Sequence, residues 1–174
     1  MQRQEEEFLD AFNQHSDALF RHAFFRLSDR ERALELTQDA FLKAWDYIRG
    51  GGEVRQFKSF LFRILNNLIV DEYRRVKQES LDELLDDEER SEMSLGLGVG
   101  GLEEKMGELE EEALVAKVRE NVAKLPEEYK VAVTLRFMDG FSPSEIARIV
   151  GTSENVVSVR IHRAIVKLRT LCAS

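Results

Sequence analysis

The feature that most limits the fold of this 174-residue chain is an acidic stretch near its middle. Residues 79–112 contain 14 acidic side chains against two basic ones, and they include the glycine-rich run SLGLGVGG. Like charges repel, glycine gains most entropy when unfolded, and the stretch has no aromatic residue to bury. The sequence therefore predicts a flexible acidic linker at 79–112 between two small domains, residues 1–78 and 113–174.

The net charge of the chain is unevenly distributed along it. The whole sequence carries a formal charge of −8, yet residues 1–78 are neutral and residues 113–174 carry +4. The acidity therefore belongs to the linker. A basic C-terminal domain is typical of proteins that bind nucleic acid, because neutralisation of phosphates dominates such affinity.

Several classes of protein are disfavoured by the composition. No apolar run approaches the roughly 20 residues that span a bilayer, and the start MQRQEEEF is unlike a secretory signal. We therefore expect a cytoplasmic protein without membrane insertion. The single Cys172 has no disulfide partner and is expected to be inert. No acid pair, activated nucleophile or phosphate-binding loop is recognisable, so we expect no enzyme, no catalytic residue, no cofactor and no metal.

Apolar side chains recur every three to four residues through the N-terminal domain, which predicts an all-α helical bundle. Ser28 and Glu31 form a capping-box pattern at the start of a second helix, and the glycines at 50–52 end it. A third helix is expected from near Lys58 to about Lys77. One face of the second helix is polar and exposed, whereas the other is apolar.

Two sequence features of the N-terminal domain indicate more than the packing of a hydrophobic core. The run VRQFKSFLFR, residues 54–63, interleaves aromatic and basic side chains. It is either a set of core phenylalanines among solvated arginines or a surface that stacks on unpaired bases and neutralises phosphates. Further along, Asp71 and Arg75 are expected to pair at a spacing of four, which leaves Arg74 free beside Asn67.

The C-terminal domain is predicted to contain four helices. Ser142, Pro143 and Glu145 give a strong helix start, Gly151 a tight turn, and a last helix begins near Ser153. The two earlier helices are expected to bury apolar stripes, which are Leu114, Val118, Val122 and Leu125, then Val131, Leu135 and Met138.

A helix, a short glycine turn and a basic amphipathic helix form the helix-turn-helix pattern, whose second helix enters the major groove of DNA. The alternative is an ordinary bundle helix with a basic face. The outward side chains best placed for base edges are Asn155, Ser158, Val159 and His162. Those best placed for phosphates are Arg163, Lys167 and Arg169. His162 has no neighbour at metal-ligand spacing.

With these segments in this order, the chain resembles a bacterial RNA polymerase sigma factor of the extracytoplasmic-function group. LTQDAFLKAWDYI, residues 36–48, resembles the helix that docks on the polymerase clamp. LFRILNNLIVDEYRR, residues 61–75, resembles the helix that opens and reads the −10 element. Residues 125–168 resemble the domain that reads the −35 element.

This resemblance implies core RNA polymerase (the clamp of its β′ subunit and the flap of its β subunit), promoter DNA and an anti-sigma factor as partners. The loop at 50–59 would hold a flipped promoter base. The implied polymerase contacts are Gln38, Asp39, Lys43, Trp45 and Asp46. The implied −10 contacts are Arg55, Phe57, Lys58, Arg63, Asn67, Arg74 and Arg75. The implied −35 contacts are Ser153, Asn155, Ser158, Val159, Arg160, His162, Arg163 and Lys167.

The sequence departs from the family at residues 156–160, where a Thr-Val-x-Ser-Arg type of run is usual. Val159 makes the outermost position of the last helix apolar. We expect it to contact a thymine methyl or a sugar, or else a partner that covers it. Two other functions stay open, a stand-alone helix-turn-helix regulator and a sigma-like mimic that binds an anti-sigma factor.

Overall fold

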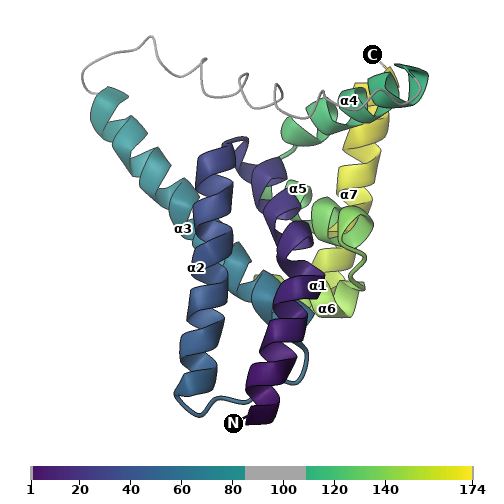
Figure 1. Cartoon of the computed structure of the whole chain (residues 1–174). Coiled ribbons are helices and arrows are strands. Elements are labelled where there is room, and N and C mark those ends of the chain that lie inside the picture. Colours follow the sequence, from purple (N-terminus) through teal and green to yellow (C-terminus); the bar gives the residue numbers. More distant parts are fainter. Residues whose placement is uncertain (1, 85–108, 174) are drawn as a thin grey trace. The chain divides into compact units, whose positions relative to one another are not determined.

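The computed structural model describes residues 2–84 and 109–173 (Figure 1). Every regular element in these two ranges is a helix, which confirms the predicted all-α class. The chain divides into two compact units, Met1–Gly100 and Gly101–Ser174. Most of the predicted linker at 79–112 lies outside the described residues.

Over residues 2–84, the first unit is a bundle of three long helices, in which each helix contacts the other two. They are α1 (Gln2–Leu27), α2 (Arg30–Arg49) and α3 (Phe57–Leu84). Its core contains an aromatic and aliphatic cluster because the apolar positions recur at helical spacing. The largest fully buried side chains of this core are Leu19, Leu61, Phe62, Leu65 and Ile69.

The boundaries of α2 and α3 differ from the sequence predictions. Asp29, not Ser28, caps α2, because its side chain accepts the backbone N–H of Arg32 at 3.1 Å. Ser28 instead adopts a left-handed conformation with φ of 55°, which terminates α1. The third helix continues to Leu84 rather than ending near Lys77.

The predicted ion pair between Asp71 and Arg75 is wrong. Arg75 bonds Glu72 through Nη2 at 2.7 Å and Glu79 through Nη1 at 2.8 Å. Asp71 lies 4.0 Å from Arg74 instead, so Arg74 is not free of acidic neighbours. The observed pair differs from the predicted one because Glu72 is a buried carboxylate that needs cationic donors, and Arg75 supplies them.

Within residues 109–173, the second unit contains four α-helices and one π-helical turn. They are α4 (Leu109–Ala123), α5 (Glu127–Val133), η1 (Thr134–Met138), α6 (Pro143–Val150) and α7 (Glu154–Ala173). α7 contacts α4, α5 and α6. The largest fully buried side chains here are Leu135, Ile146 and Val157.

Two of the predicted apolar stripes are only partly buried. Leu114 is 62% exposed and Val118 is also exposed, whereas Asn121 and Val122 at the C-terminal end of α4 are buried. Met138 is 45% exposed because the preceding turn is π-helical, with the N–H of Asp139 bonded to the carbonyl of Thr134 at 3.1 Å. The wider turn rotates Met138 outward, and Phe141 is buried just after it.

Candidate nucleic-acid interface

The helix-turn-helix of the second unit is held by caps at each of its corners. Glu145 and Ser142 form a reciprocal capping box, with bonds of 3.2 and 3.0 Å. Gly151 ends α6 with φ of 75°, a left-handed conformation that glycine adopts without strain. The hydroxyl of Ser153 then accepts the N–H of Val156 at 3.3 Å and caps α7. The predicted caps at Ser142 and Gly151 are confirmed.

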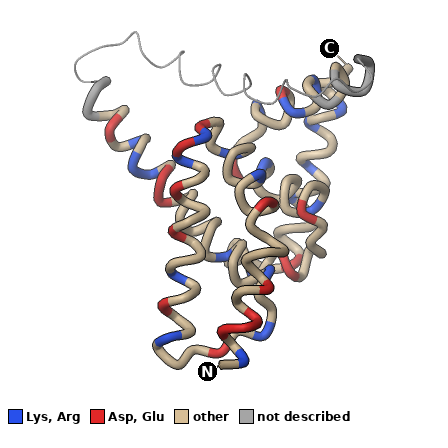
Figure 2. The backbone as a smooth tube through the Cα atoms, viewed as in Figure 1, with Lys and Arg blue, Asp and Glu red and all other residues tan. Residues whose placement is uncertain are grey.

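The side chains of α7 separate into a buried and an exposed face. Val157 and Ala164 are fully buried against the rest of the unit. Val159 lies on the opposite face and is 47% exposed. The other predicted −35 contacts that are exposed are Ser153, Asn155, Ser158, His162, Arg163 and Lys167. Figure 2 shows basic residues recurring along this helix. The structure therefore places an accessible, polar and basic surface on the second helix of the motif.

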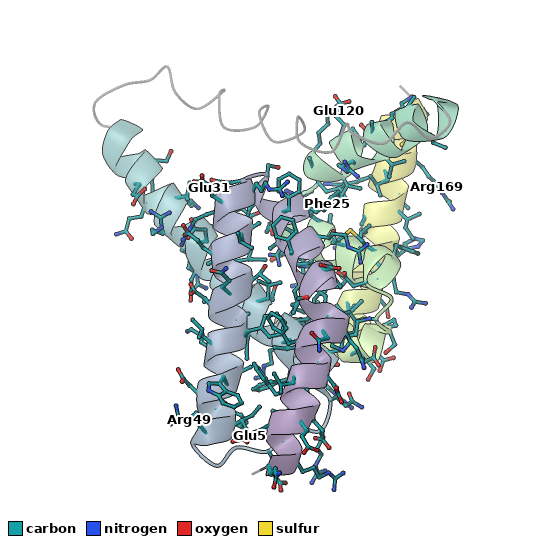
Figure 3. All side chains as sticks on the ribbon, in the orientation of Figure 1. Glu5, Phe25, Glu31, Arg49, Glu120 and Arg169 are labelled. Carbon is teal, nitrogen blue, oxygen red and sulfur yellow. The ribbon has the colours of Figure 1, made fainter. Side chains whose placement is uncertain are left out.

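Two of the predicted −35 contacts are oriented by α5. Arg160 is only 26% exposed in its side chain and lies 3.9 Å from the carboxylate of Glu128. The ammonium of Lys167 lies 5.3 Å from the ring centroid of Tyr129, at cation–π distance. Neither contact was predicted, because both join segments that are distant in sequence. Arg169 is exposed and projects outward from α7 (Figure 3).

In the first unit, α3 carries an exposed polar strip. Arg63, Asn67 and Arg74 are exposed and spaced by four and seven residues, which places them on one side of the helix. Asn66, next to this strip, is buried and accepts a bond of 2.7 Å from the guanidinium of Arg26. The predicted strip is thus accessible, while its neighbour ties α3 to α1.

A buried carboxylate connects α2, α3 and the predicted DNA contact Arg75. Glu72 is 5% exposed and accepts bonds from Arg32 at 2.8 Å and from Arg75 at 2.7 Å. Hydrogen bonds from Arg32, and then from Arg75, lower the pKa of Glu72 from 4.5 to about 2. Sequence reasoning missed Glu72, since only the spacing of three before Arg75 signals it. Arg75 is therefore held by acidic partners on its own helix.

The run at residues 54–63 contains both buried and accessible aromatic side chains. Phe62 is fully buried, which confirms the core interpretation for that residue. Phe57 and Phe60 are half-buried, and the ring of Phe60 contacts that of Tyr47 with centroids 5.2 Å apart. Arg55 before them is exposed, and Lys58 is half-buried. A stacking surface at the start of α3 stays a prediction.

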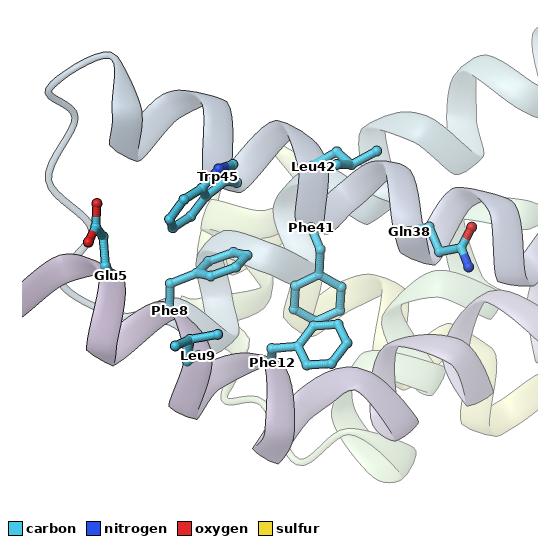
Figure 4. A pocket seen from close by; sticks show the side chains of 8 residues that line it. All are labelled: Glu5, Phe8, Leu9, Phe12, Gln38, Phe41, Leu42 and Trp45. Atoms are coloured by element: carbon cyan, nitrogen blue, oxygen red, sulfur yellow. The ribbon is translucent and has the colours of Figure 1, made fainter. Parts of the chain in front are cut away.

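The polar face of α2 borders an open apolar groove (Figure 4). Gln38, Asp39, Lys43 and Asp46, four of the predicted polymerase contacts, are exposed on this helix. Trp45, the fifth, is half-buried, with its ring centroid 5.1 Å from that of Phe8. The groove has a volume of about 630 Å³ and is lined by Glu5, Phe8, Leu9, Phe12, Gln38, Phe41, Leu42 and Trp45. Such an exposed apolar surface is typical of a protein-binding site.

Within residues 2–84 and 109–173, no group of His, Cys, Asp and Glu side chains could hold a metal ion. Over the same ranges, no helix has the length and apolar character needed to span a membrane. Cys172 is half-buried, and its sulfur accepts a bond of 3.2 Å from the amide of Asn121.

Two models of one protein family match the chain in the order of its two units. The model of Sigma-70 region 2 matches residues 11–79, and the model of Sigma-70 region 4 matches residues 116–168. Together they cover about two thirds of the sequence, including α2, most of α3, and the helix-turn-helix.

Relatives and a solved structure match nearly the whole chain. The ECF RNA polymerase sigma factor SigW of Bacillus subtilis is 28% identical over 93% of this chain and 87% of its own length. SigL of Mycobacterium tuberculosis, another ECF RNA polymerase sigma factor, is 25% identical over 91% of this chain and 84% of its own length. The sigma factor RpoE, solved in complex with the anti-sigma factor NepR from Bartonella quintana, has a TM-score of 0.75 and 22% identity over 97% of this chain and 98% of that chain.

Proposed function

The chain belongs to the extracytoplasmic-function group of the sigma-70 family, and from this premise we propose that it directs core RNA polymerase to promoters. The observation that carries the proposal is the presence of both DNA-reading regions in one chain, in family order. A helix-turn-helix regulator has no need of region 2, and a mimic has no need of an exposed basic strip on α3. Sigma factors are initiation factors, and we propose that this one has no catalytic activity of its own and acts in the cytoplasm.

We propose that α7 reads the −35 element as duplex DNA. Asn155, Ser158 and His162 are exposed where a helix in the major groove meets base edges. Ser153 lies at the N-terminus of the same helix, where N–H groups favour a phosphate. Arg163 and Lys167 flank this surface and supply phosphate contacts, which set register without reading sequence. Arg160, which lies 3.9 Å from Glu128, contributes a positive charge at the edge.

We propose that the first unit reads the −10 element as a separated strand. Arg63, Asn67 and Arg74 form an exposed strip that can follow a phosphate backbone. Phe57, half-buried, can stack on an unpaired base, and Arg55 and Lys58 lie beside it in the sequence. Arg75 is placed by Glu72 and Glu79 and acts as a fixed charge at the end of the strip.

We propose that α2 and the apolar groove beside it bind the clamp of the β′ subunit, and that the second unit binds the flap of the β subunit. The exposed Gln38, Asp39, Lys43 and Asp46 give the clamp polar contacts around an apolar centre. When the protein is not bound to polymerase, this apolar groove is exposed to water. We propose that an anti-sigma factor binds the groove in that state.

Promoter-selective transcription tests the proposed function. The full chain is mixed with core polymerase and a library of promoter fragments, and run-off transcripts are sequenced. Specific start sites with shared −10 and −35 sequences are expected. Tight binding to duplex DNA without polymerase, and no specific transcript with it, would favour the regulator. Binding to neither core polymerase nor DNA would favour the mimic.

A further inference from the structure

The loop between α2 and α3 is tied to the start of α1 by one glutamine. The side chain of Gln4 accepts the backbone N–H of Val54 at 3.0 Å and donates to the carbonyl of the same residue at 3.4 Å. Val54 is buried, although it lies in a loop. Figure 1 shows this loop passing beside the N-terminal end of α1. A side chain from a distant helix therefore satisfies both backbone groups of a loop residue, as a neighbouring strand would.

The opposite side of the loop is fixed by Tyr47. The N–H of Gly52 bonds the carbonyl of Tyr47 at 2.9 Å, and a Cβ atom at Gly52 would lie 2.3 Å from the tyrosine ring. Gly51, with φ of 93°, makes the turn between them. The ring of Tyr47 in turn contacts Phe60 in the first turn of α3. The loop is consequently anchored at both of its sides.

A cavity of about 430 Å³ lies beside Gln4. We interpret the side chains that line it as a support for the loop and not as a ligand site. It is lined by Arg3, Gln4, Glu7, Glu53, Val54 and Arg55. Its polar groups already bond one another, since Glu7 accepts from Arg3 at 2.9 Å and from Gln4 at 2.8 Å. Glu53 and Arg55 are the exceptions, because neither makes a hydrogen bond or ion pair with any part of the chain that the structure describes. The guanidinium of Arg55 is therefore exposed at the surface next to the supported loop.

We propose that Gln4 is a positioning residue for recognition of the separated −10 strand. By fixing the backbone of Val54, it fixes the position of the chain from which the adjacent Arg55 projects and the entry into α3 at Phe57. The loop is then ordered before DNA binds, so the entropy of ordering it does not weaken the complex. The side chain of Gln4 bonds Val54 and Glu7, and we assign it no contact with DNA. This inference rests on the proposed function, because it assigns a role within −10 reading.

Gln4→Ala and Gln4→Glu in the full chain test this inference, with Gln14→Ala as the control. Gln14 lies on the same helix and is exposed. The first readout is hydrogen exchange at the Val54 amide. The second is the ratio of open complexes that the holoenzyme forms on a promoter and on variants with one substituted −10 base. Gln4→Ala should raise exchange and lower −10 discrimination, each by roughly three- to tenfold, the effect of one or two hydrogen bonds.

Gln4→Glu keeps an acceptor for the Val54 N–H but places a second carboxylate beside Glu7, to which Gln4 donates at 2.8 Å, so both of its readouts should change at least as much as those of Gln4→Ala. Discrimination at −35 and core affinity should stay at the wild-type level in all variants, and Gln14→Ala should match the wild type throughout. Faster exchange with unchanged −10 discrimination would overturn the positioning role, as would an equal loss of −10 and −35 discrimination. A wild-type holoenzyme without promoter selectivity would contradict the proposed function itself, whatever the exchange data show.

Discussion

The arginines of the two helices proposed to read DNA, α3 in the first unit and α7 in the second, differ in their ion pairs. On α3, Arg74 and Arg75 both lie beside acids on the same helix, and Arg75 is bonded to two of them. On α7, Arg163 and Arg169 are exposed and make no ion pair with any described residue. The charges of Arg163 and Arg169 are therefore available to phosphates, whereas that of Arg75 is engaged by its acidic partners on α3.

The difference fits the two kinds of DNA that the helices are proposed to bind. A duplex presents two phosphate rows at high charge density, and free cations on a groove-bound helix gain most from it. A separated strand offers exposed base faces, so aromatic stacking supplies affinity and fewer free cations are needed. The contrast predicts that perturbing electrostatics in the first unit changes mainly stability, whereas in the second unit it changes mainly DNA affinity.

The largest expected effect is acid destabilisation of the first unit through Glu72. Its pKa is lowered from 4.5 to about 2, so its contribution to stability is complete above pH 4.5 and is lost as the pH falls toward 2. The shift corresponds to roughly 3 kcal/mol. Trp45, the single tryptophan, lies on α2, and its fluorescence during urea unfolding at several pH values reports on this unit.

Glu72→Gln should remove this pH dependence and lower stability at neutral pH by a similar amount, because Arg32 loses its buried partner. Glu79→Gln is the matched control, since Glu79 bonds Arg75, the other arginine that Glu72 holds, but is exposed. Its effect should stay below about 0.5 kcal/mol. An equal acid slope in the wild type and Glu72→Gln would show that the cation network does not stabilise the first unit.

The next largest effect is expected in the second unit from its backbone rather than its charges. Gly151 has φ of 75°, and a Cβ atom there would meet nothing within 4 Å. Gly151→Ala should therefore cost roughly 1–2 kcal/mol through the left-handed conformation alone. Thermal unfolding measures the loss, and Thr152→Ala serves as the neighbouring control. Loss of −35 binding without loss of stability would instead indicate that the turn contacts DNA directly.

The features predictable from the sequence are those set within a few residues. The capping box of Ser142 and the turn at Gly151 were predicted because a cap is decided by its own turn. The start of α2 was misplaced by one residue because Ser28 and Asp29 are both good caps, and the conformation of Ser28 decided between them. The exposed face of α7 followed from its periodicity alone.

The features that escaped prediction depend on contacts between distant segments. The burial of Glu72 requires Arg32 from another helix, forty residues away. The bond from Gln4 to Val54 spans fifty residues, and nothing local marks either partner. The π-helical turn at Thr134–Met138 rotated Met138 out of a stripe that a regular helix would have buried. Each of these is a property of packing, which a single sequence reports only indirectly.

A smaller effect tests the contrast in free cations directly. Arg163→Ala should reduce the dependence of −35 duplex affinity on salt by about one phosphate, a change of roughly 0.9 in the slope of log K against log salt. One free phosphate contact on a single strand is worth roughly 0.7 in the corresponding slope, and Arg74→Ala should change the slope for −10 strand binding by clearly less than that, since Asp71 lies 4.0 Å from Arg74. Titrations at several salt concentrations measure both slopes. A change of about 0.7 for Arg74→Ala would remove the proposed distinction between the two helices.

The smallest effect concerns Val159, where the second unit is expected to use an apolar contact in place of charge. If Val159 covers a thymine methyl, replacing that thymine with uracil should weaken wild-type binding by roughly fourfold, the value of one buried methyl group. Val159→Ser should bind both DNAs alike. Val166, exposed two turns later on the same face, is the control, and Val166→Ser should keep the wild-type sensitivity. If Val159→Ser still binds the uracil DNA more weakly than the thymine DNA, another side chain contacts the thymine methyl. Wild-type binding that is unaffected by uracil at every position would instead leave Val159 as a surface for a protein partner.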